Sequence, residues 1–314
     1  MTEQLDTPRA LIRWGAERFE YADLVYAHGT DNALDEAAYL VMRSLQIDYD
    51  QPDSVLDTVL SEADSRRVRE LLELRMSSRK PAAYLLHEAW FAGLPFHVDE
   101  RVLVPRSPIA ELIESRFAPW IKPDQVRRVL DMCTGSGCIG IACAFAFPDA
   151  RVDVSDISTD ALAVATENIR RHALEDRVTA IESDVFAALQ GRRYDIIVVN
   201  PPYVPGEEQQ SLAPEFGHEP PLGLFAGPEG LDIVVEILCH AGEFLSPHGI
   251  LVVEVGYTED VLVQRLPGVP FMWLDFEHGG TGVFMLDAQQ LQQYRPAFKQ
   301  AADALSQTGK QDVR

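Results

Sequence analysis

The chain has 314 residues, of which 46% are hydrophobic, and it carries a formal net charge of −22. This length allows one large domain or two smaller ones with a sizeable core. The negative charge disfavours nucleic acid as a direct partner, because phosphate backbones are repelled, and it favours a basic protein partner. The sequence contains no signal-type segment at its start and no apolar run of about 18 residues that could cross a membrane. We therefore expect a cytoplasmic protein without a membrane partner.

The first 87 residues predict a small helical domain. Thr7-Pro8 is a typical helix start, and apolar residues then recur at helical spacing in three successive segments. At Glu88 the composition changes to aromatic and β-branched residues, which lie on both sides of Asp99-Glu100. Residues 88–105 are therefore predicted to form a β-hairpin, with 102–104 in its second strand, that links this domain to the rest of the chain.

Residues 106–290 alternate between short apolar runs and amphipathic segments, which predicts strands alternating with helices. This pattern is typical of an α/β, doubly wound and mostly parallel sheet. Two late apolar runs flank a glycine-rich turn and predict a closing antiparallel pair. The predicted strands, seven in all, are residues 129–133, 151–155, 178–181, 194–199, 250–255, 271–276 and 283–286. The polar, glutamine-rich residues 291–314 are predicted to be a frayed helix or a tail.

A glycine loop follows the first of these strands. Gly135, Gly137 and Gly140 fit the pattern Gly-x-Gly-x-x-Gly, so a nicotinamide-dependent oxidoreductase is one interpretation. Two acidic residues favour a different cofactor. Asp131 precedes the loop inside the strand and suits a cationic amino group, and Asp156 ends the next strand, where a carboxylate can accept hydrogen bonds from both hydroxyls of a ribose.

Asp184-Val185 ends the third predicted strand. There, a carboxylate can accept a hydrogen bond from an adenine amino group, and the following backbone N–H can donate to the ring. A simple turn aspartate is the structural alternative.

The turn Asn200-Pro201-Pro202-Tyr203 follows the fourth predicted strand, at the sheet edge where α/β proteins place ligands. Asn200 offers a carbonyl acceptor, and the two prolines stiffen the turn and fix the directions of its carbonyls. Acceptors beside one aromatic ring suit a planar NH2 group. A plain strand-ending turn is the alternative, because proline pairs commonly mark loops.

The four cysteines predict no metal site. Cys133, Cys138 and Cys143 follow one another at steps of five residues, which do not return to one helix face, and no fourth ligand lies near them. We interpret them as buried structural thiols in a reducing compartment.

Taken together, the glycine loop, the three acids and the Asn-Pro-Pro-Tyr turn resemble class I S-adenosylmethionine-dependent methyltransferases. Within that class, the turn, the segment 80–85 and the segment Val102 to Leu112 resemble the protein-(glutamine-N5) methyltransferases. One branch of this family acts on peptide-chain release factors and another on the third protein of the large ribosomal subunit. Pro105-Arg106-Ser107-Pro108-Ile109 resembles the second branch.

The resemblance implies a methyl transfer from S-adenosylmethionine to the side-chain amide of a glutamine, with residues 1–87 recognising a basic ribosomal protein. No metal takes part in this chemistry. The implied catalytic residues are Asn200, Pro201, Pro202 and Tyr203. The implied cofactor-binding residues are Asp131, Cys133, Thr134, Gly135, Gly137, Asp156, Asp184, Val185 and Asn200. Three alternatives stay open: glutamine methylation of release factors, methylation of an exocyclic amino group in nucleic acid, and the oxidoreductase.

Overall fold

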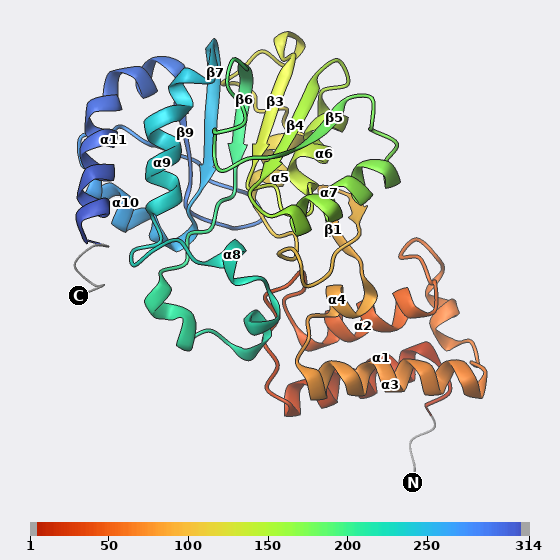
Figure 1. Ribbon diagram of the computed structural model, residues 1–314. Coiled ribbons are helices and arrows are strands. Elements are labelled where there is room, and N and C mark those ends of the chain that lie inside the picture. The colour runs from red at the N-terminus through yellow and green to blue at the C-terminus, as the bar shows by residue number, and fades with distance from the viewer. Residues whose placement is uncertain (1–4, 309–314) are drawn as a thin grey trace.

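The computed structural model describes residues 5–308, which form a helical part and a larger α/β part (Figure 1). The helical part begins where the sequence predicts it, because the Thr7 hydroxyl accepts a hydrogen bond from Ala10 N at 3.2 Å and Pro8 occupies the first turn. Its core includes Leu11 and Leu72, which are fully buried. Its elements are α1 (Pro8–Tyr21), α2 (Ala33–Ser44), η1 (Asp53–Asp57), α3 (Glu62–Ser78) and α4 (Ala82–Leu86).

The hairpin that links the two parts is shorter than predicted and turns elsewhere. Strands β1 (Ala89–Phe91) and β2 (Leu94–Phe96) pair around Ala92-Gly93, where both residues have positive φ angles of 46° and 73°. Such a two-residue turn matches the twist of the flanking strands. The predicted strand at residues 102–104 is wrong. These residues are mostly buried but pair with no strand, and the Val104 N–H donates to the Glu219 side chain instead.

The α/β part contains a seven-stranded sheet of order β5-β4-β3-β6-β7-β9-β8, so the predicted doubly wound class is confirmed. The first five strands in this order are parallel, and β9 runs antiparallel to both of its neighbours, β7 and the edge strand β8. The strands are β3 (Arg128–Met132), β4 (Arg151–Asp156), β5 (Val178–Glu182), β6 (Tyr194–Val199), β7 (Leu245–Glu254), β8 (Met272–Trp273) and β9 (Val283–Asp287).

Helices cover both faces of this sheet, because successive side chains of each buried strand point to opposite sides. In β6, Ile196 and Val198 belong to the core shared with α5, α6 and α7, whereas Ile197 and Val199 belong to the core shared with α9 and α11. The covering helices are α5 (Ile109–Glu114), α6 (Cys138–Ala146), α7 (Thr159–Arg171), α9 (Asp232–His240), α10 (Glu259–Arg265) and α11 (Ala288–Thr308).

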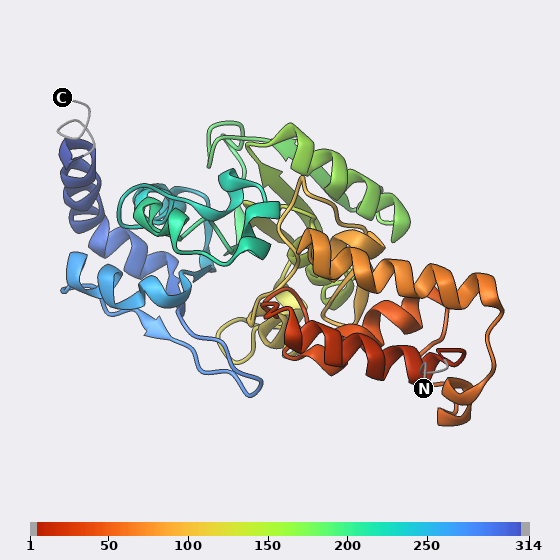
Figure 2. The same cartoon turned by 90° about the horizontal axis from the view of Figure 1, so that it is seen from below.

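The C-terminal segment is a regular helix within the described residues, so of the two predicted alternatives, a frayed helix or a tail, the helix is found and the tail is wrong there. Helix α11 packs on α9 and β7, and it buries Leu291, Phe298 and Ala301. The apolar spacing of these three residues outweighs the glutamine-rich composition. Helices α1 and α11 lie at opposite ends of the molecule (Figure 2). Residues 309–314 of the predicted tail lie outside the described part of the chain.

A long connection follows β6 and lies between the sheet and the helical part (Figure 1). It contains η3 (Gly206–Gln210), η4 (Pro214–His218) and the short helix α8 (Pro221–Leu224). Residue Val204 bridges to Phe225, which folds this connection back beside the end of β6. The shorter 3-10 elements elsewhere are η2 (Pro123–Gln125), η5 (Ala241–Glu243) and η6 (Gly256–Thr258).

Candidate active site at the carboxyl ends of β3, β4 and β6

The glycine loop joins β3 to α6 and is organised by Asp131. This side chain is 1% exposed, and its Oδ2 accepts hydrogen bonds from Thr134 Oγ1 at 2.5 Å and from Gly140 N at 2.8 Å. Burial raises the pKa of Asp131 to about 7, against the lowering effect of these two hydrogen bonds. Asp131 Oδ1 is buried and has no hydrogen-bond partner. A buried oxygen without a donor fits the predicted interaction with a cationic group.

The loop itself needs unusual backbone angles. Cys133, Gly135 and Gly137 all have positive φ, at 56°, 54° and 82°. A Cβ atom on Gly135 would meet nothing within 4 Å, so that position faces open space where a ligand can approach the backbone. Gly137 has a different role, because a Cβ there would lie 3.2 Å from Ala165 Cβ. It allows the start of α6 to pack closely on α7.

Asp156 ends β4 and reaches back to the same loop. Its Oδ2 accepts a hydrogen bond from Gly135 N at 3.0 Å, and its Oδ1 accepts one from Ser158 N at 2.9 Å. Burial raises the pKa of this carboxyl, and the backbone hydrogen bonds act in the opposite direction. Asp184 follows β5 and is exposed, whereas Val185 is buried with φ at 43°. The strand ends therefore bring the two predicted acids to one edge of the sheet.

One cavity of about 510 Å³ connects these residues to the Asn-Pro-Pro-Tyr turn, and this size falls in the range of cofactor sites. Its lining contains all the predicted site residues except Asp131 and Gly137, which lie behind the loop surface. The lining residues that were predicted are Cys133, Thr134, Gly135, Asp156, Asp184, Val185, Asn200, Pro201, Pro202 and Tyr203.

The ring of Tyr203 contacts the Gly256 backbone and lies near the Glu254 side chain. A Cβ atom on Gly256 would lie 2.8 Å from Tyr203 Cε2, so the ring packs directly on that backbone. Burial raises the pKa of Tyr203, and the nearby Glu254 carboxylate adds to this effect. Glu254 is 4% exposed and accepts a hydrogen bond from Ser107 Oγ at 2.5 Å. Burial raises the pKa of Glu254 to about 7.

The sequence did not point to several residues of the cavity wall. Arg106 and Ser107 were recognised only as part of a family segment, and Phe216, Pro220 and Tyr257 were not assigned to the site. All five line the cavity. Arg106 and Ser107 precede α5, Phe216 and Pro220 belong to the long connection after β6, and Tyr257 belongs to η6. No local pattern marks these residues. The high density of prolines between residues 205 and 228 was the one available signal of a fixed, functional loop.

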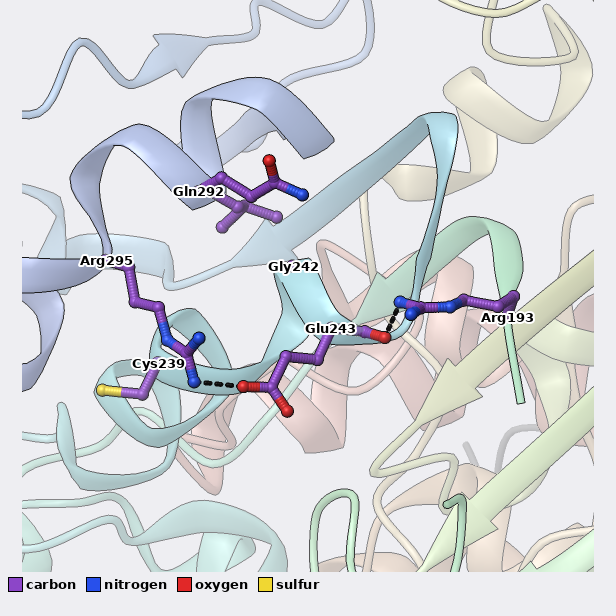
Figure 3. A pocket seen from close by; sticks show the side chains of 7 residues that line it. Arg193, Cys239, Gly242, Glu243, Gln292 and Arg295 are labelled. Atoms are coloured by element: carbon purple, nitrogen blue, oxygen red, sulfur yellow. Dashed lines mark hydrogen bonds and ion pairs between the residues drawn. The ribbon is translucent and has the colours of Figure 1, made fainter. Parts of the chain in front are cut away.

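A separate cavity of about 260 Å³ lies under α11 and contains none of the predicted site residues (Figure 3). The side chain of Arg295 pairs with the Glu243 carboxylate, and Arg193 donates to the Glu243 backbone carbonyl. These contacts join η5 to α11 and to the loop before β6. We therefore interpret this cavity as a gap in packing rather than as a reaction site.

The structure gives no sign of a metal centre or a membrane span within residues 5–308. No group of three or more His, Cys, Asp or Glu side chains there is placed to hold a metal ion. All four cysteines are free, and burial raises the pKa of Cys138 to about 12. No helix among the described residues is both long and apolar enough to cross a bilayer.

Comparison with known proteins identifies the chain. Residues 115–219 match the family model of the methyltransferase small domain. The catalytic domain of hMettl16, solved with a MAT2A 3′UTR hairpin, has a TM-score of 0.50 and 14% identity, over 89% of this chain and 90% of that one. At that identity the likeness concerns the fold alone. The fold, the glycine loop and the matched model define a methyltransferase.

Three relatives named ribosomal protein uL3 glutamine methyltransferase are 44%, 48% and 50% identical to the chain. They come from Francisella tularensis, Xanthomonas campestris and Xylella fastidiosa, and the alignments cover 94%, 96% and 92% of this chain and 94%, 98% and 92% of theirs. The chain belongs to the family of ribosomal protein uL3 glutamine methyltransferases. The predicted family and its ribosomal-protein branch are confirmed, and these relatives give no support to an oxidoreductase.

Proposed function

We propose that this enzyme transfers a methyl group from S-adenosylmethionine to the N5 side-chain amide nitrogen of a glutamine in ribosomal protein uL3. The observation that carries this proposal is the shared cavity, which is lined by the glycine loop and Asp156 and also by Asn200 to Tyr203. Because the strands lie in the order β4, β3, β6, Asp156 and Asn200 stand on opposite sides of the loop that follows β3. The cofactor and the target amide would thus meet within one cavity. The reaction takes place in the cytoplasm, where ribosomal proteins are made.

The cofactor end of the cavity suits a nucleoside that carries an amino acid. Asp156 accepts from the ribose hydroxyls, while Asp184 and the Val185 N–H bind the adenine edge. Cys133, Thr134 and Gly135 contribute the backbone surface along the amino-acid portion. Asp131 Oδ1, which is buried and has no hydrogen-bond partner, lies behind the loop, where a bound cationic group would favour the ionised carboxylate. When bound, S-adenosylmethionine supplies a methyl group on a cationic sulfur.

The turn solves the main chemical difficulty, which is that an amide nitrogen is a poor nucleophile because its lone pair is delocalised into the carbonyl. The Asn200 side-chain oxygen and the Pro201 carbonyl accept the two N–H hydrogens and so orient the nitrogen. As the nitrogen becomes cationic during transfer, these acceptors bind it more tightly than they bound the neutral amide. Pro202 keeps the turn rigid.

Tyr203 holds the plane of the substrate amide by packing its ring against it. The ring cannot retreat, because it rests on the Gly256 backbone. The product nitrogen is acidic enough to release its proton to water, so the residues near the turn need not include a general base. This agrees with the positions of His218 and His240, neither of which lines the cavity.

A basic protein substrate agrees with the charge of the segment that bears the site. No lysine or arginine occurs between Arg193 and Arg265, a stretch that includes the turn and much of the cavity wall. Together with the net charge of −22, this segment attracts a basic partner and repels phosphate backbones.

Incubation of the purified enzyme with methyl-labelled S-adenosylmethionine and separately with uL3, a release factor and total RNA tests the proposal. We expect label in uL3, located on a glutamine side chain by mass spectrometry. Label on the release factor alone would refute the substrate. Label that nuclease treatment removes would point to nucleic acid instead.

A further inference from the structure

Two buried glutamates fasten the connection after the Asn-Pro-Pro-Tyr turn to the helical part of the enzyme. The side chains of Glu215 and Glu219 are both 0% exposed and lie at the two ends of η4. Glu215 accepts a hydrogen bond from Val25 N at 3.1 Å, and its Oε1 lies 2.9 Å from Arg79 Nη2. All of these partners belong to the helical part, so Glu215 joins two structural units without touching the cavity.

Glu219 has a wider set of partners. Its two carboxylate oxygens accept hydrogen bonds from both terminal nitrogens of Arg106, each at 2.6 Å, and Oε1 also accepts from Val104 N at 3.0 Å. His28 Nε2, from the helical part, lies 3.5 Å from Oε2. Burial acts to raise the pKa of Glu219, but His28 and Arg106 outweigh it and hold this pKa at about 2. The carboxylate is therefore ionised and fixed from three directions.

The groups that Glu219 holds reach the cavity. Arg106 and Phe216 both line it, and the guanidinium lies 5.6 Å above the Phe216 ring. The His28 ring packs against the Phe216 ring as well, with the two ring centroids 4.8 Å apart. Arg106 is also close enough to Tyr203 to act on its pKa. The contacts of Glu219 with Arg106 and His28 thus determine the position of one wall of the cavity beside Asn200 to Tyr203.

We propose that Glu219 is a positioning residue for methyl transfer, which fixes Arg106 and Phe216 in the cavity wall and makes the helical domain part of the active site. This inference rests on the proposed function. Glu219 also neutralises Arg106. An unpaired guanidinium in the cavity would repel the cationic sulfur and the nitrogen that becomes positive during transfer. The ion pair between Glu219 and Arg106 reduces this repulsion.

Glu215 provides a matched control, because it too is a buried glutamate between an arginine and a backbone N–H. In Glu219→Gln, the new NH2 group would face the Arg106 donors and release the guanidinium. We expect kcat/KM for uL3, per folded molecule, to fall on the order of 10- to 100-fold, as for other small losses of alignment. The dissociation constant for S-adenosylmethionine, measured by calorimetry, should stay within about two-fold. Glu215→Gln should lower the melting temperature but leave kcat/KM within about two-fold.

If Glu219→Gln does not fold, a second variant tests whether the pair of Glu219 and Arg106 is needed for methyl transfer. Arg106→Lys keeps the positive charge but cannot form the two-pronged pair with Glu219, so we expect a folded enzyme with kcat/KM reduced about ten-fold and cofactor affinity unchanged. Equal losses in Glu215→Gln and Glu219→Gln, or full activity in Arg106→Lys, would overturn the inference. If wild-type enzyme labels another protein than uL3, the substrate proposal fails, and the same variants are compared on that protein.

Discussion

The two ends of the cavity are built in different ways. At the cofactor end, the hydrogen bonds of Asp131 and Asp156 reach residues between 2 and 21 positions away, all within one strand–helix–strand segment. At the substrate end, Glu219 reaches Arg106 across 113 positions and Ser107 reaches Glu254 across 147. The cofactor end can therefore form within one strand–helix–strand segment, whereas the substrate end forms only when distant segments of the α/β part come together. His28 of the helical part adds a further contact to Glu219.

The two ends also share one feature, a buried carboxyl group that supports the reactive surface from behind. Asp131 orders the glycine loop and Glu254 supports Tyr203, and burial raises the pKa of each to about 7. Both groups keep their charge only where hydrogen-bond donors surround them. Perturbing one end at a time should thus reveal how independent the ends are.

The largest expected effect is that of Asn200→Ala at the substrate end. Removing one acceptor that binds the developing positive charge should lower kcat by about 10²- to 10³-fold. The affinity for S-adenosylmethionine, measured by calorimetry, should fall much less than kcat, because Asp156 and the loop are untouched and Asn200 is only one of the predicted cofactor contacts. Gln210→Ala, which also removes an amide but from an exposed position, serves as the control and should be fully active. Wild-type turnover in Asn200→Ala would contradict the role of the turn.

The second prediction concerns pH, since each end carries a carboxyl whose pKa is higher in the folded state than in the unfolded chain. Such a group stabilises the fold fully below its unfolded pKa, about 4, and this stabilisation is lost as the pH rises through about 7. We expect each group to contribute a decline of ~2–4 kcal/mol in unfolding free energy over this range. This decline is measured by denaturant unfolding of the cofactor-free enzyme at pH 4.5 and at pH 8, which lie at about the two ends of the range.

The variants Asp131→Asn and Glu254→Gln remove one titrating group each and should flatten the pH dependence by comparable amounts. Additive effects in the double variant would show that the two ends respond independently. If both variants keep the wild-type slope, other carboxylates cause the pH dependence, and the two supports are not protonated near neutral pH.

Most residues that the sequence marked for cofactor binding line one cavity in the structure, and they could be marked because they follow one another closely in the chain. A strand, a glycine loop and an acid at the end of the next strand have a local pattern, and so does Asn200 to Tyr203 after β6. Glu219 and Glu254 have none. In the sequence, Glu219 is indistinguishable from any loop glutamate and Glu254 from any glutamate at the end of a strand. Their partners lie more than a hundred positions away and are brought near only by folding.

The same reason explains the wrong secondary-structure predictions. Residues 102–104 are β-branched and leucine-rich and therefore resemble a strand, but the Val104 N–H finds its acceptor in the Glu219 carboxylate. The length and regularity of helix α11 were underestimated because its composition is polar. Its few apolar residues, among them Phe298 at 0% exposure, lie at helical spacing and suffice to attach it to the sheet.

A smaller effect should follow from Gly140→Ala at the cofactor end. The new Cβ would lie 2.4 Å from Val154 Cγ1 and 3.0 Å from Asp131 Cβ, so the loop support must shift. We expect a loss of about 1–3 kcal/mol in stability, together with weaker binding of S-adenosylmethionine. Gly268→Ala is the matched control, because a Cβ there meets nothing within 4 Å. Unchanged cofactor affinity in Gly140→Ala would show that the loop tolerates movement of Asp131.

The smallest effect is expected for Cys133→Gly, because the relief of an unfavourable φ angle and the greater freedom of glycine in the unfolded chain change the stability in opposite directions. Cys133 has a φ of 56°, and leaving a side chain in this left-handed region costs about 1–2 kcal/mol, which glycine relieves. Glycine in turn loses about 0.5–1 kcal/mol through the greater freedom of its unfolded chain. The melting temperature should hence barely change, and cofactor affinity should persist. Cys133→Val introduces a β-branched side chain at the same φ and should be clearly destabilised. If the valine variant were as stable as the glycine variant, the loop would be free to leave this conformation, and the cofactor end would be less rigid than the substrate end.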